Sequence, residues 1–267
     1  EFRRVLFRSL IDKYLYKIIS VSKAVKNNLM KNGVKESIID VIPLSIDVNR
    51  FKNGNGNKIR DEFSIEENDM VFGTIGRFQE IKGQKLIVEA CKLLKDENIN
   101  IKFLMVGDAI FLNEKDIAYK KEVSELIEKY NLTDNIILLG KRNDIPNIMK
   151  ALNALIIPSI NESFGMVVIE AFAAECCVIT TPCDGPKELI NNKVNGIVLQ
   201  NRNAKELKDA IKNFILDKGL RVNIKENLKK EKNKYDIETM CLKYEELYRS
   251  TLWKKEMLYY ILRLTYL

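Results

Sequence analysis

Two glutamates eight positions apart, Glu162 and Glu170, lie in the stretch of this sequence whose residue types are best suited to chemistry. From Phe164 to Ala174, every residue except Glu170 is apolar or small. A carboxylate inside such a segment is costly to bury unless a partner forms hydrogen bonds with it. The sequence therefore predicts that Glu170 meets a ligand or a protein donor. The competing interpretation is an amphipathic helix on which Glu170 faces water.

The same stretch predicts a helix that begins beside Glu162. Ser163 is the expected N-cap of a helix starting at Phe164 or Gly165, after a buried strand over residues 154–157. Gly165 leaves the first turn bare, so its N–H groups would attract an anion. Glu162 would lie at the entrance of this site, Glu170 about two helical turns further in, and the anion between them. This layout suits a nucleoside diphosphate sugar.

A second cluster places two basic side chains in a loop, residues 76–83, after a buried strand. Arg77 offers a forked donor and Lys82 a point charge, and together they are enough to neutralise a diphosphate leaving group. Two solvated cations in a surface loop would give the same pattern.

The elements that must position these residues alternate regularly along the chain. Apolar runs predict strands near residues 71–75, 101–106, 136–139, 154–157, 177–180 and 196–199. Between them, apolar residues recur at helical spacing, as in residues 83–95 and 120–130. This alternation predicts an α/β fold with a doubly wound parallel sheet, which binds ligands at the carboxyl ends of its strands. Both clusters fall at such ends.

Composition excludes several classes of site. The 267 residues, 46% hydrophobic and 30% charged, are ordinary for a soluble globular protein. The net charge of +7 comes from dispersed lysines, which is typical of a solvated surface; a polyanionic ligand or an anionic membrane face is the alternative. Five cysteines, two of them adjacent, favour a reducing cytosol over a disulfide framework. Histidine is absent and no metal-binding motif is present, so we expect no metal.

The glutamate pair resembles the Glu-x7-Glu motif of retaining glycosyltransferases with the GT-B fold. Residues 76–83 resemble the Gly-Arg-x4-Lys-Gly loop of that family, and residues 41–47 resemble the run that leads into its interdomain linker. Residues 181–188 resemble its Gly-Gly-x-x-Glu loop but have Asp184 at the first glycine, which puts backbone approach to the sugar there in doubt. These motifs occur in the family's order over roughly residues 15 to 250, and their joint occurrence is more specific than any one of them.

The resemblance implies roles for particular residues. Glu170 would bind the ribose, Glu162 would contact the transferred sugar, and Arg77 and Lys82 would grip the diphosphate. Backbone groups around the diphosphate, the sugar and the base would come from a further set of positions: Gly76, Phe164, Gly165, Met166, Val167, Lys141 and Arg142.

The resemblance also implies a domain organisation. Residues 1–9 fit no element and are expected to be non-native, and residues 10–52 are expected to be a remnant of the acceptor domain with its linker. The polar run 53–57 is expected to be flexible. Residues 53–234 would form a Rossmann-like donor-binding domain, and residues 235–267 a long crossover helix and tail. Residues 257–267 are too short to span a bilayer; an interfacial anchor, an oligomer contact and ordinary packing stay open.

We therefore expect a cytoplasmic glycosyltransferase of the family 4 type that moves a hexose from a UDP- or GDP-sugar to a glycan or lipid-linked acceptor with retention of configuration. A peripheral contact with the inner membrane face is left open, and neither a cofactor nor a nucleic-acid partner is expected. The family's usual first-domain histidine or aspartate is missing, so the chain is expected to bind donor, and transfer is left open. The alternatives are a GT-B nucleotide-sugar epimerase or phosphorylase, and a non-catalytic module that binds nucleotide sugars or nucleic acid.

Overall fold

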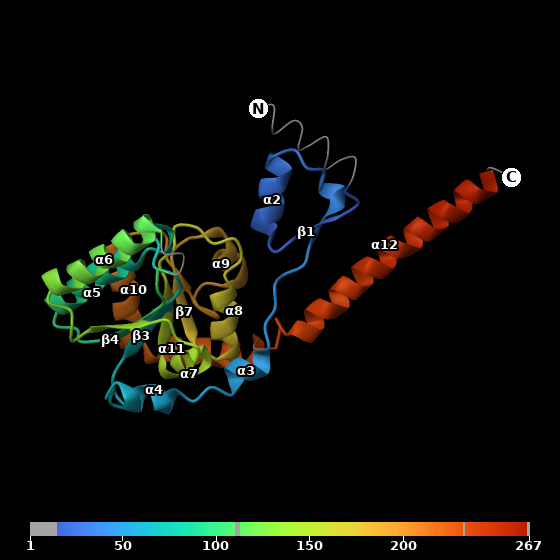
Figure 1. Cartoon of the computed structure of the whole chain (residues 1–267). Coiled ribbons are helices and arrows are strands. Elements are labelled where there is room, and N and C mark those ends of the chain that lie inside the picture. Colours follow the sequence, from blue (N-terminus) through green and yellow to red (C-terminus); the bar gives the residue numbers. More distant parts are fainter. Residues whose placement is uncertain (1–14, 110–112, 232, 266–267) are drawn as a thin grey trace. The chain divides into compact units, whose positions relative to one another are not determined.

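The computed structural model describes residues 15–109, 113–231 and 233–265, with side chains as far as Thr251. The expected non-native segment 1–9 and the side chains of the tail 257–267 lie outside these residues. The chain divides into two compact units (Figure 1). The smaller unit comprises residues 1–46 and 234–267, and the larger unit comprises residues 47–233. The larger unit therefore begins at Asp47, before the boundary expected at residue 53.

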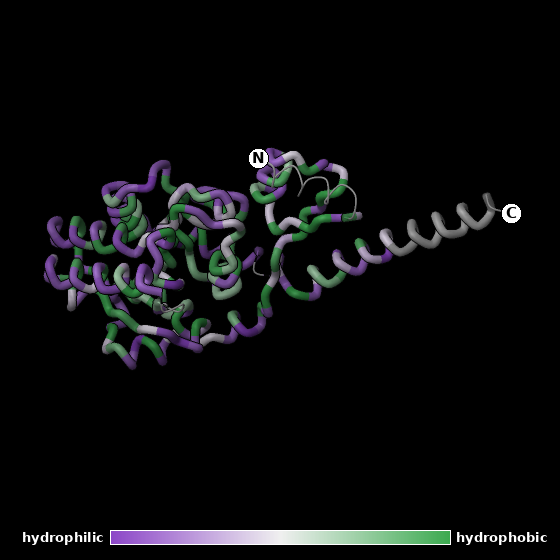
Figure 2. Tube along the Cα trace, turned by 45° about the horizontal axis from the view of Figure 1, so that its top comes forward, coloured by the Kyte–Doolittle hydropathy of each residue, from purple (hydrophilic) through white to green (hydrophobic). Residues whose placement is uncertain are grey.

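A parallel sheet forms the centre of the larger unit and confirms the predicted fold class. Its strands within the described residues are β3 (Val71–Ile75), β4 (Lys102–Val106), β5 (Ile136–Gly140), β6 (Ala154–Ile157), β7 (Cys177–Thr180) and β8 (Ile197–Val198). They lie in the order β5-β4-β3-β6-β7-β8, and each neighbouring pair is parallel. Figure 2 shows hydrophobic residues along the central strands and hydrophilic residues along much of the surrounding helices. Residues on both faces of β6 and β7 are buried, as expected for a sheet covered on two sides.

Helices cover both faces of the sheet. They are α3 (Val48–Lys52), α4 (Gly56–Glu62), α5 (Gln84–Asp96), α6 (Glu114–Lys129), α7 (Ile145–Ala151), α8 (Met166–Ala173), α9 (Asp184–Leu189), α10 (Ala204–Leu216) and α11 (Lys218–Glu231). Helix α5 packs against α6 and α10, whereas α3 packs against α7 and α8 (Figure 1). The Phe72 and Phe214 rings, 6.0 Å apart and edge-to-face, join β3 to α10 inside the first layer.

The strand order identifies where a ligand crevice should lie. From β3 the chain proceeds outward through β4 to β5, and it then returns to β6, which pairs with the other edge of β3. This reversal is a topological switch point, and in open α/β sheets ligands bind there, at the carboxyl ends of the strands. The loops concerned are residues 76–83 and 158–165, which contain both clusters identified in the sequence.

Two local predictions were wrong. Helix α8 begins at Met166, and its N-cap is Gly165 in the left-handed conformation (φ 92°), not Ser163. A side chain would be strained at this φ, so glycine permits the turn that delays the helix start. The run 53–57 is not a flexible linker either, because it connects α3 to α4 and packs on α7. A Cβ added to Gly54 would lie 2.3 Å from the Pro146 carbonyl oxygen, which explains the glycine there.

In the smaller unit, β1 (Ile18–Ser20) and β2 (Ile39–Val41) pair in parallel and flank α2 (Lys23–Lys31). Ser22 caps α2 as predicted, because its side chain accepts a hydrogen bond from the Val25 amide at 3.1 Å. The long helix α12 (Ile237–Thr265) follows a backbone bridge in which Ile46 N–H donates to the Tyr235 carbonyl at 3.0 Å. Among the described residues, no helix combines the length and the apolar character needed to cross a membrane.

Candidate functional site

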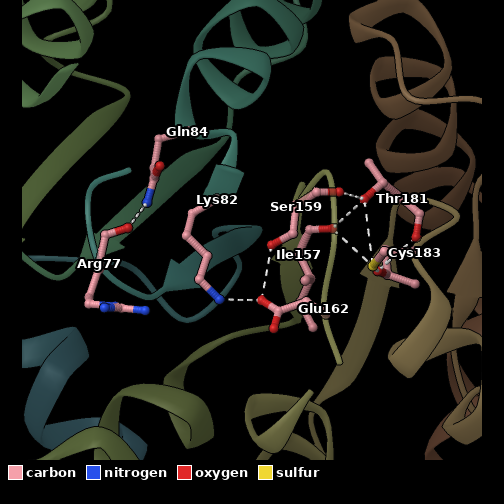
Figure 3. Close-up of polar contacts among 9 residues, drawn as sticks. Arg77, Lys82, Gln84, Ile157, Ser159, Glu162, Thr181 and Cys183 are labelled. Atoms are coloured by element: carbon pink, nitrogen blue, oxygen red, sulfur yellow. Dashed lines mark hydrogen bonds and ion pairs between the residues drawn. The ribbon is translucent and has the colours of Figure 1, made fainter. Parts of the chain in front are cut away.

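The loops at the switch point contact each other through backbone and side chains. The Ile160 amide donates to the Ile81 carbonyl at 2.8 Å. One residue further along the first loop, the Lys82 ammonium forms an ion pair with the Glu162 carboxylate (Figure 3). Both side chains are partly exposed, with 24% and 16% of their surfaces accessible. The tertiary structure thus brings a predicted cation and a predicted carboxylate of the site into direct contact.

The loop 76–83 is held from several directions. Phe78 is buried in the core, and its amide donates to the Asp108 carbonyl at 3.1 Å. The Gln79 side chain donates to the buried Asp116 carboxylate at 2.8 Å. Gln84, in the first turn of α5, donates its side-chain amide to the Arg77 carbonyl at 2.8 Å (Figure 3). In Figure 3, the Arg77 and Lys82 side chains extend toward the same side of the loop. The structure therefore fixes the backbone that carries both basic residues.

Glu162 receives contacts from three segments. Its Oε1 atom accepts hydrogen bonds from Lys82 and, at 3.2 Å, from the Ser159 hydroxyl, and its backbone carbonyl accepts one from the Gly185 amide at 2.8 Å. Gly185 approaches so closely that an added Cβ would lie 2.5 Å from the Phe164 nitrogen. The close backbone approach in residues 181–188 is thus made at Gly185, while Asp184 is an exposed residue of the first turn of α9.

The first turn of α8 follows directly. Its N-cap, Gly165, provides no side-chain cap, and Met166 is exposed beyond it. Phe164 is buried, and Val167 is partly buried. The helix start therefore lies close to Glu162 in the chain and is not closed by a capping side chain, an arrangement that suits an anion.

Glu170 lies one turn deeper on α8 and is partly buried. Burial raises the pKa of its carboxyl group, while the positive charge of Arg50 on α3 opposes that shift. Within the part of the chain that the structure describes, no hydrogen bond or ion pair reaches this carboxylate. Glu170 is thus not the fully solvated residue of the competing interpretation. The Arg50 charge offsets only part of its desolvation, and no hydrogen bond from the described residues offsets the rest.

Arg142 is engaged elsewhere. Its terminal nitrogens donate to the two Glu62 carboxylate oxygens at 2.6 and 2.8 Å, and its Nε donates to Asp144 at 2.8 Å. These contacts raise the pKa of Arg142 and lower the pKa values of Glu62 and Asp144. Arg142 therefore ties the loop after β5 to α4, whereas the adjacent Lys141 is exposed. The structure does not join either residue to the Lys82–Glu162 pair.

Sequence reasoning missed the polar residues behind the glutamate. Ser159 and Thr181 are almost completely buried at the ends of β6 and β7. The Thr181 hydroxyl donates to the Ser159 carbonyl at 2.6 Å and lies 3.2 Å from the Ile157 carbonyl (Figure 3). Both residues follow directly after buried strands, and this position in the sequence could have identified them as part of the site. No cluster of three or more metal-ligating side chains occurs among the described residues.

Comparisons with known proteins identify the family of this chain. Residues 55–231, more than half of the chain, match the family described as "Glycosyl transferases group 1". An uncharacterized glycosyltransferase of Methanocaldococcus jannaschii is 29% identical over 235 residues, 87% of this chain and 59% of that protein. The UDP-Gal:alpha-D-GlcNAc-diphosphoundecaprenol alpha-1,3-galactosyltransferase of Escherichia coli is 27% identical over 214 residues, 79% of this chain and 54% of that protein. The chain thus spans less than two thirds of these relatives.

Solved structures share the fold over most of the chain. The Anabaena protein HepE in complex with UDP-glucose superposes with a TM-score of 0.84 at 25% identity, over 93% of this chain and 68% of that one. A glycosyltransferase from Rickettsia africae superposes with a TM-score of 0.84 at 27% identity, over 92% of this chain and 67% of that one.

Proposed function

Because the chain belongs to the glycosyl transferases group 1 family, we propose that its larger unit binds a nucleoside diphosphate hexose at the carboxyl ends of β3 and β6, beside residues 76–83 and 158–165. We propose further that this unit serves the transfer of that hexose to a glycan or lipid-linked acceptor with retention of configuration. The relatives support these choices: HepE is bound to UDP-glucose, and the Escherichia coli relative is named for a UDP-sugar and a diphosphoundecaprenol acceptor. UDP is therefore the first nucleotide to test, with GDP second.

The Lys82–Glu162 ion pair is the single observation that carries the proposal. A nucleoside diphosphate sugar presents anionic oxygens next to sugar hydroxyls, so its site needs a cation and a carboxylate within one ligand's length. Lys82 and Arg77 meet the diphosphate, together with the amides at the start of α8 from Phe164 to Val167. Glu162 meets the hydroxyls of the hexose. Gly76 has no side chain to obstruct the diphosphate beside Arg77. The space in front of its backbone is open, because an added Cβ there would meet nothing within 4 Å.

The buried carboxylate supports the nucleoside end of the site. Glu170 is partly desolvated and has no hydrogen-bond or ion-pair partner among the described residues. Two ribose hydroxyls would supply the missing hydrogen bonds, and they would offset the cost of holding this carboxylate away from water. Lys141 would meet the base from the loop after β5, which Arg142 holds through its own carboxylate partners.

The chemistry follows from these contacts. The bond between the anomeric carbon and the diphosphate oxygen breaks, and the acceptor hydroxyl forms a new bond on the face that the diphosphate leaves. The acceptor proton passes to the departing diphosphate oxygen. Arg77, Lys82 and the α8 amides stabilise the negative charge that develops on the leaving group, and Glu162 orients the hexose. No step requires a metal, because the cations of the chain meet the diphosphate directly.

Calorimetric titration of the full chain with UDP, GDP, ADP and UDP-glucose tests the proposal. We expect one nucleotide and its sugar to bind, and we expect Arg77→Ala and Glu170→Ala each to weaken that binding by at least about tenfold, the effect of losing a charge-assisted hydrogen bond. Lys121→Met, which removes an exposed lysine of α6, is the matched control. Unaltered affinity in both site variants would remove the assignment. Steeply salt-dependent RNA binding without any response to nucleotide sugars would favour the nucleic-acid alternative.

A further inference from the structure

We propose that Ser159 and Thr181 are positioning residues that hold the Glu162 carboxylate in the orientation that the hexose requires. The inference rests on the proposed function, because it takes Glu162 as the hexose contact. Neither residue would touch the sugar nucleotide itself: each is at most 2% exposed.

The carboxylate has one oxygen on the protein side. Lys82 and the Ser159 hydroxyl both donate to Oε1 of Glu162. Among the described residues, no donor contacts Oε2. Protein donors therefore saturate one oxygen, and the other remains available to accept hydrogen bonds from sugar hydroxyls. Lys82 is a long and flexible side chain that the diphosphate would also attract. The short, buried Ser159 is consequently the contact that keeps the carboxylate plane in place when the ligand arrives.

Ser159 is in turn held from the next strand. The Thr181 hydroxyl donates to the Ser159 carbonyl at 2.6 Å, and the Thr181 amide donates to the Ile157 carbonyl at 3.0 Å. Ser159 lies beyond the end of β6, so its buried carbonyl accepts no hydrogen bond from a neighbouring strand's backbone. Among the described residues, the Thr181 hydroxyl donates to this carbonyl. The chain of contacts runs from the end of β7 through Ser159 to Glu162 (Figure 3). A shift of the Ser159 backbone would move its hydroxyl and release the carboxylate.

A positioning role and a merely structural role predict different effects. UDP is held by Arg77, Glu170 and the start of α8, whereas Glu162 meets only the hexose. Loss of the Ser159 or Thr181 hydroxyl should therefore reduce the extra affinity that the hexose contributes and leave UDP affinity in place. General loosening of the site would weaken UDP and UDP-glucose together. The ratio of the two dissociation constants, Kd(UDP)/Kd(UDP-glucose), separates the two roles.

The experiment is calorimetric titration of the full chain with UDP and with UDP-glucose, in wild type, Ser159→Ala and Thr181→Val. We expect the ratio to fall about three- to tenfold in both variants, the range for one neutral hydrogen bond. Thr180→Val is the matched control, because this equally buried threonine donates to the Ile157 and Thr181 carbonyls and not to Ser159. Thr181→Ser, which keeps the hydroxyl, should retain the wild-type ratio.

The outcomes separate the two proposals. An unchanged ratio in Ser159→Ala, with wild-type UDP affinity, would overturn the positioning role and leave the proposed function standing. A ratio that falls equally in Thr180→Val would overturn it as well, because the effect would then be one of packing. If Thr181→Val fails to fold, Ser159→Ala and Thr181→Ser decide the matter. Failure of wild type to bind either UDP or UDP-glucose would instead overturn both proposals for this nucleotide.

Discussion

Lys82 and Glu162 form an ion pair although 80 positions separate them in the chain. The contact exists because β3 and β6, which their loops follow, are neighbours in the sheet. In the proposed complex the same lysine would also meet the diphosphate, so the carboxylate and the ligand compete for one ammonium group. This competition leads to the first of five predictions.

Lys82→Met should weaken UDP binding about ten- to hundredfold, because a charge-assisted hydrogen bond contributes about 1.5–3 kcal/mol. Glu162→Gln should leave UDP affinity unchanged or slightly tighter, since it removes the competitor for Lys82, while it reduces the extra affinity of UDP-glucose. Calorimetric titration with both ligands measures this. Equal losses of UDP affinity in the two variants would contradict the assigned roles.

Gly76→Ala should lower UDP affinity without changing the melting temperature. A Cβ at this position meets nothing within 4 Å in the structure, so the folded state has room for it. The same space is where the proposed ligand approaches the backbone. Gly185→Ala is the contrasting variant, because its Cβ would lie 2.5 Å from the Phe164 nitrogen and should lower the melting temperature. Unchanged UDP affinity in Gly76→Ala would exclude Gly76 from the site.

Glu170→Gln should raise the melting temperature at neutral pH and weaken UDP binding. Burial raises the pKa of Glu170 above its ordinary value of 4.5, so the ionised carboxyl destabilises the fold at pH values above its native pKa. This cost disappears as the pH falls through the raised pKa to about 4.5, and the advantage of the variant should disappear with it. Melting curves between pH 4 and 8 measure the effect, and pyrophosphate, which lacks a ribose, should bind both proteins equally. A variant less stable than wild type at pH 8 would contradict the prediction.

Arg142→Met should lower the melting temperature and leave UDP affinity within about threefold, a change below 1 kcal/mol. The side chain is occupied by Glu62 and Asp144, so its removal breaks a link between α4 and the loop after β5. Lys141→Met, at the neighbouring exposed position, is the comparison variant: it should lower UDP affinity if Lys141 contacts the ligand. A large loss of UDP affinity in a well-folded Arg142→Met protein would instead support a direct role in reading the base.

Glu97→Gln should destabilise the protein in a pH-dependent way. Lys208 and Lys212 on α10 donate to the Glu97 carboxylate at 2.7 and 2.6 Å and lower its pKa to about 2. A depressed carboxyl pKa stabilises the fold above the unfolded value, and this contribution is lost as the pH falls from about 4.5 to about 2. The difference in melting temperature from wild type should therefore be largest near neutral pH and should shrink with acid and with salt. Glu89→Gln is the control, because Glu89 is an exposed glutamate of α5, the helix that Glu97 caps at its C-terminal end. A pH-independent difference would refute the assignment.

Local sequence patterns predicted the elements that are stabilised by interactions between residues close together in the chain. The Ser22 cap of α2 needs only a hydroxyl before a helix, and the buried strands follow from runs of apolar residues. The same reasoning failed at Ser163, because Gly165 takes the left-handed conformation and delays the start of α8 to Met166. It also failed at residues 53–57, where the backbone of α7 orders glycines that in isolation would be flexible.

Periodicity and turn chemistry in the chain alone thus specified the alternating strands and helices and placed the basic loop and the glutamate pair at strand ends. The order of the strands determined the rest. Only the pairing of β3 with β6 brings Lys82 to Glu162, and only the pairing of β6 with β7 sets the Thr181 hydroxyl behind Ser159. Likewise, Arg142 meets Glu62 because α4 packs on α7. These contacts join residues distant in sequence, and burial of the whole core, to which no single segment contributes enough, selects the arrangement in which they meet.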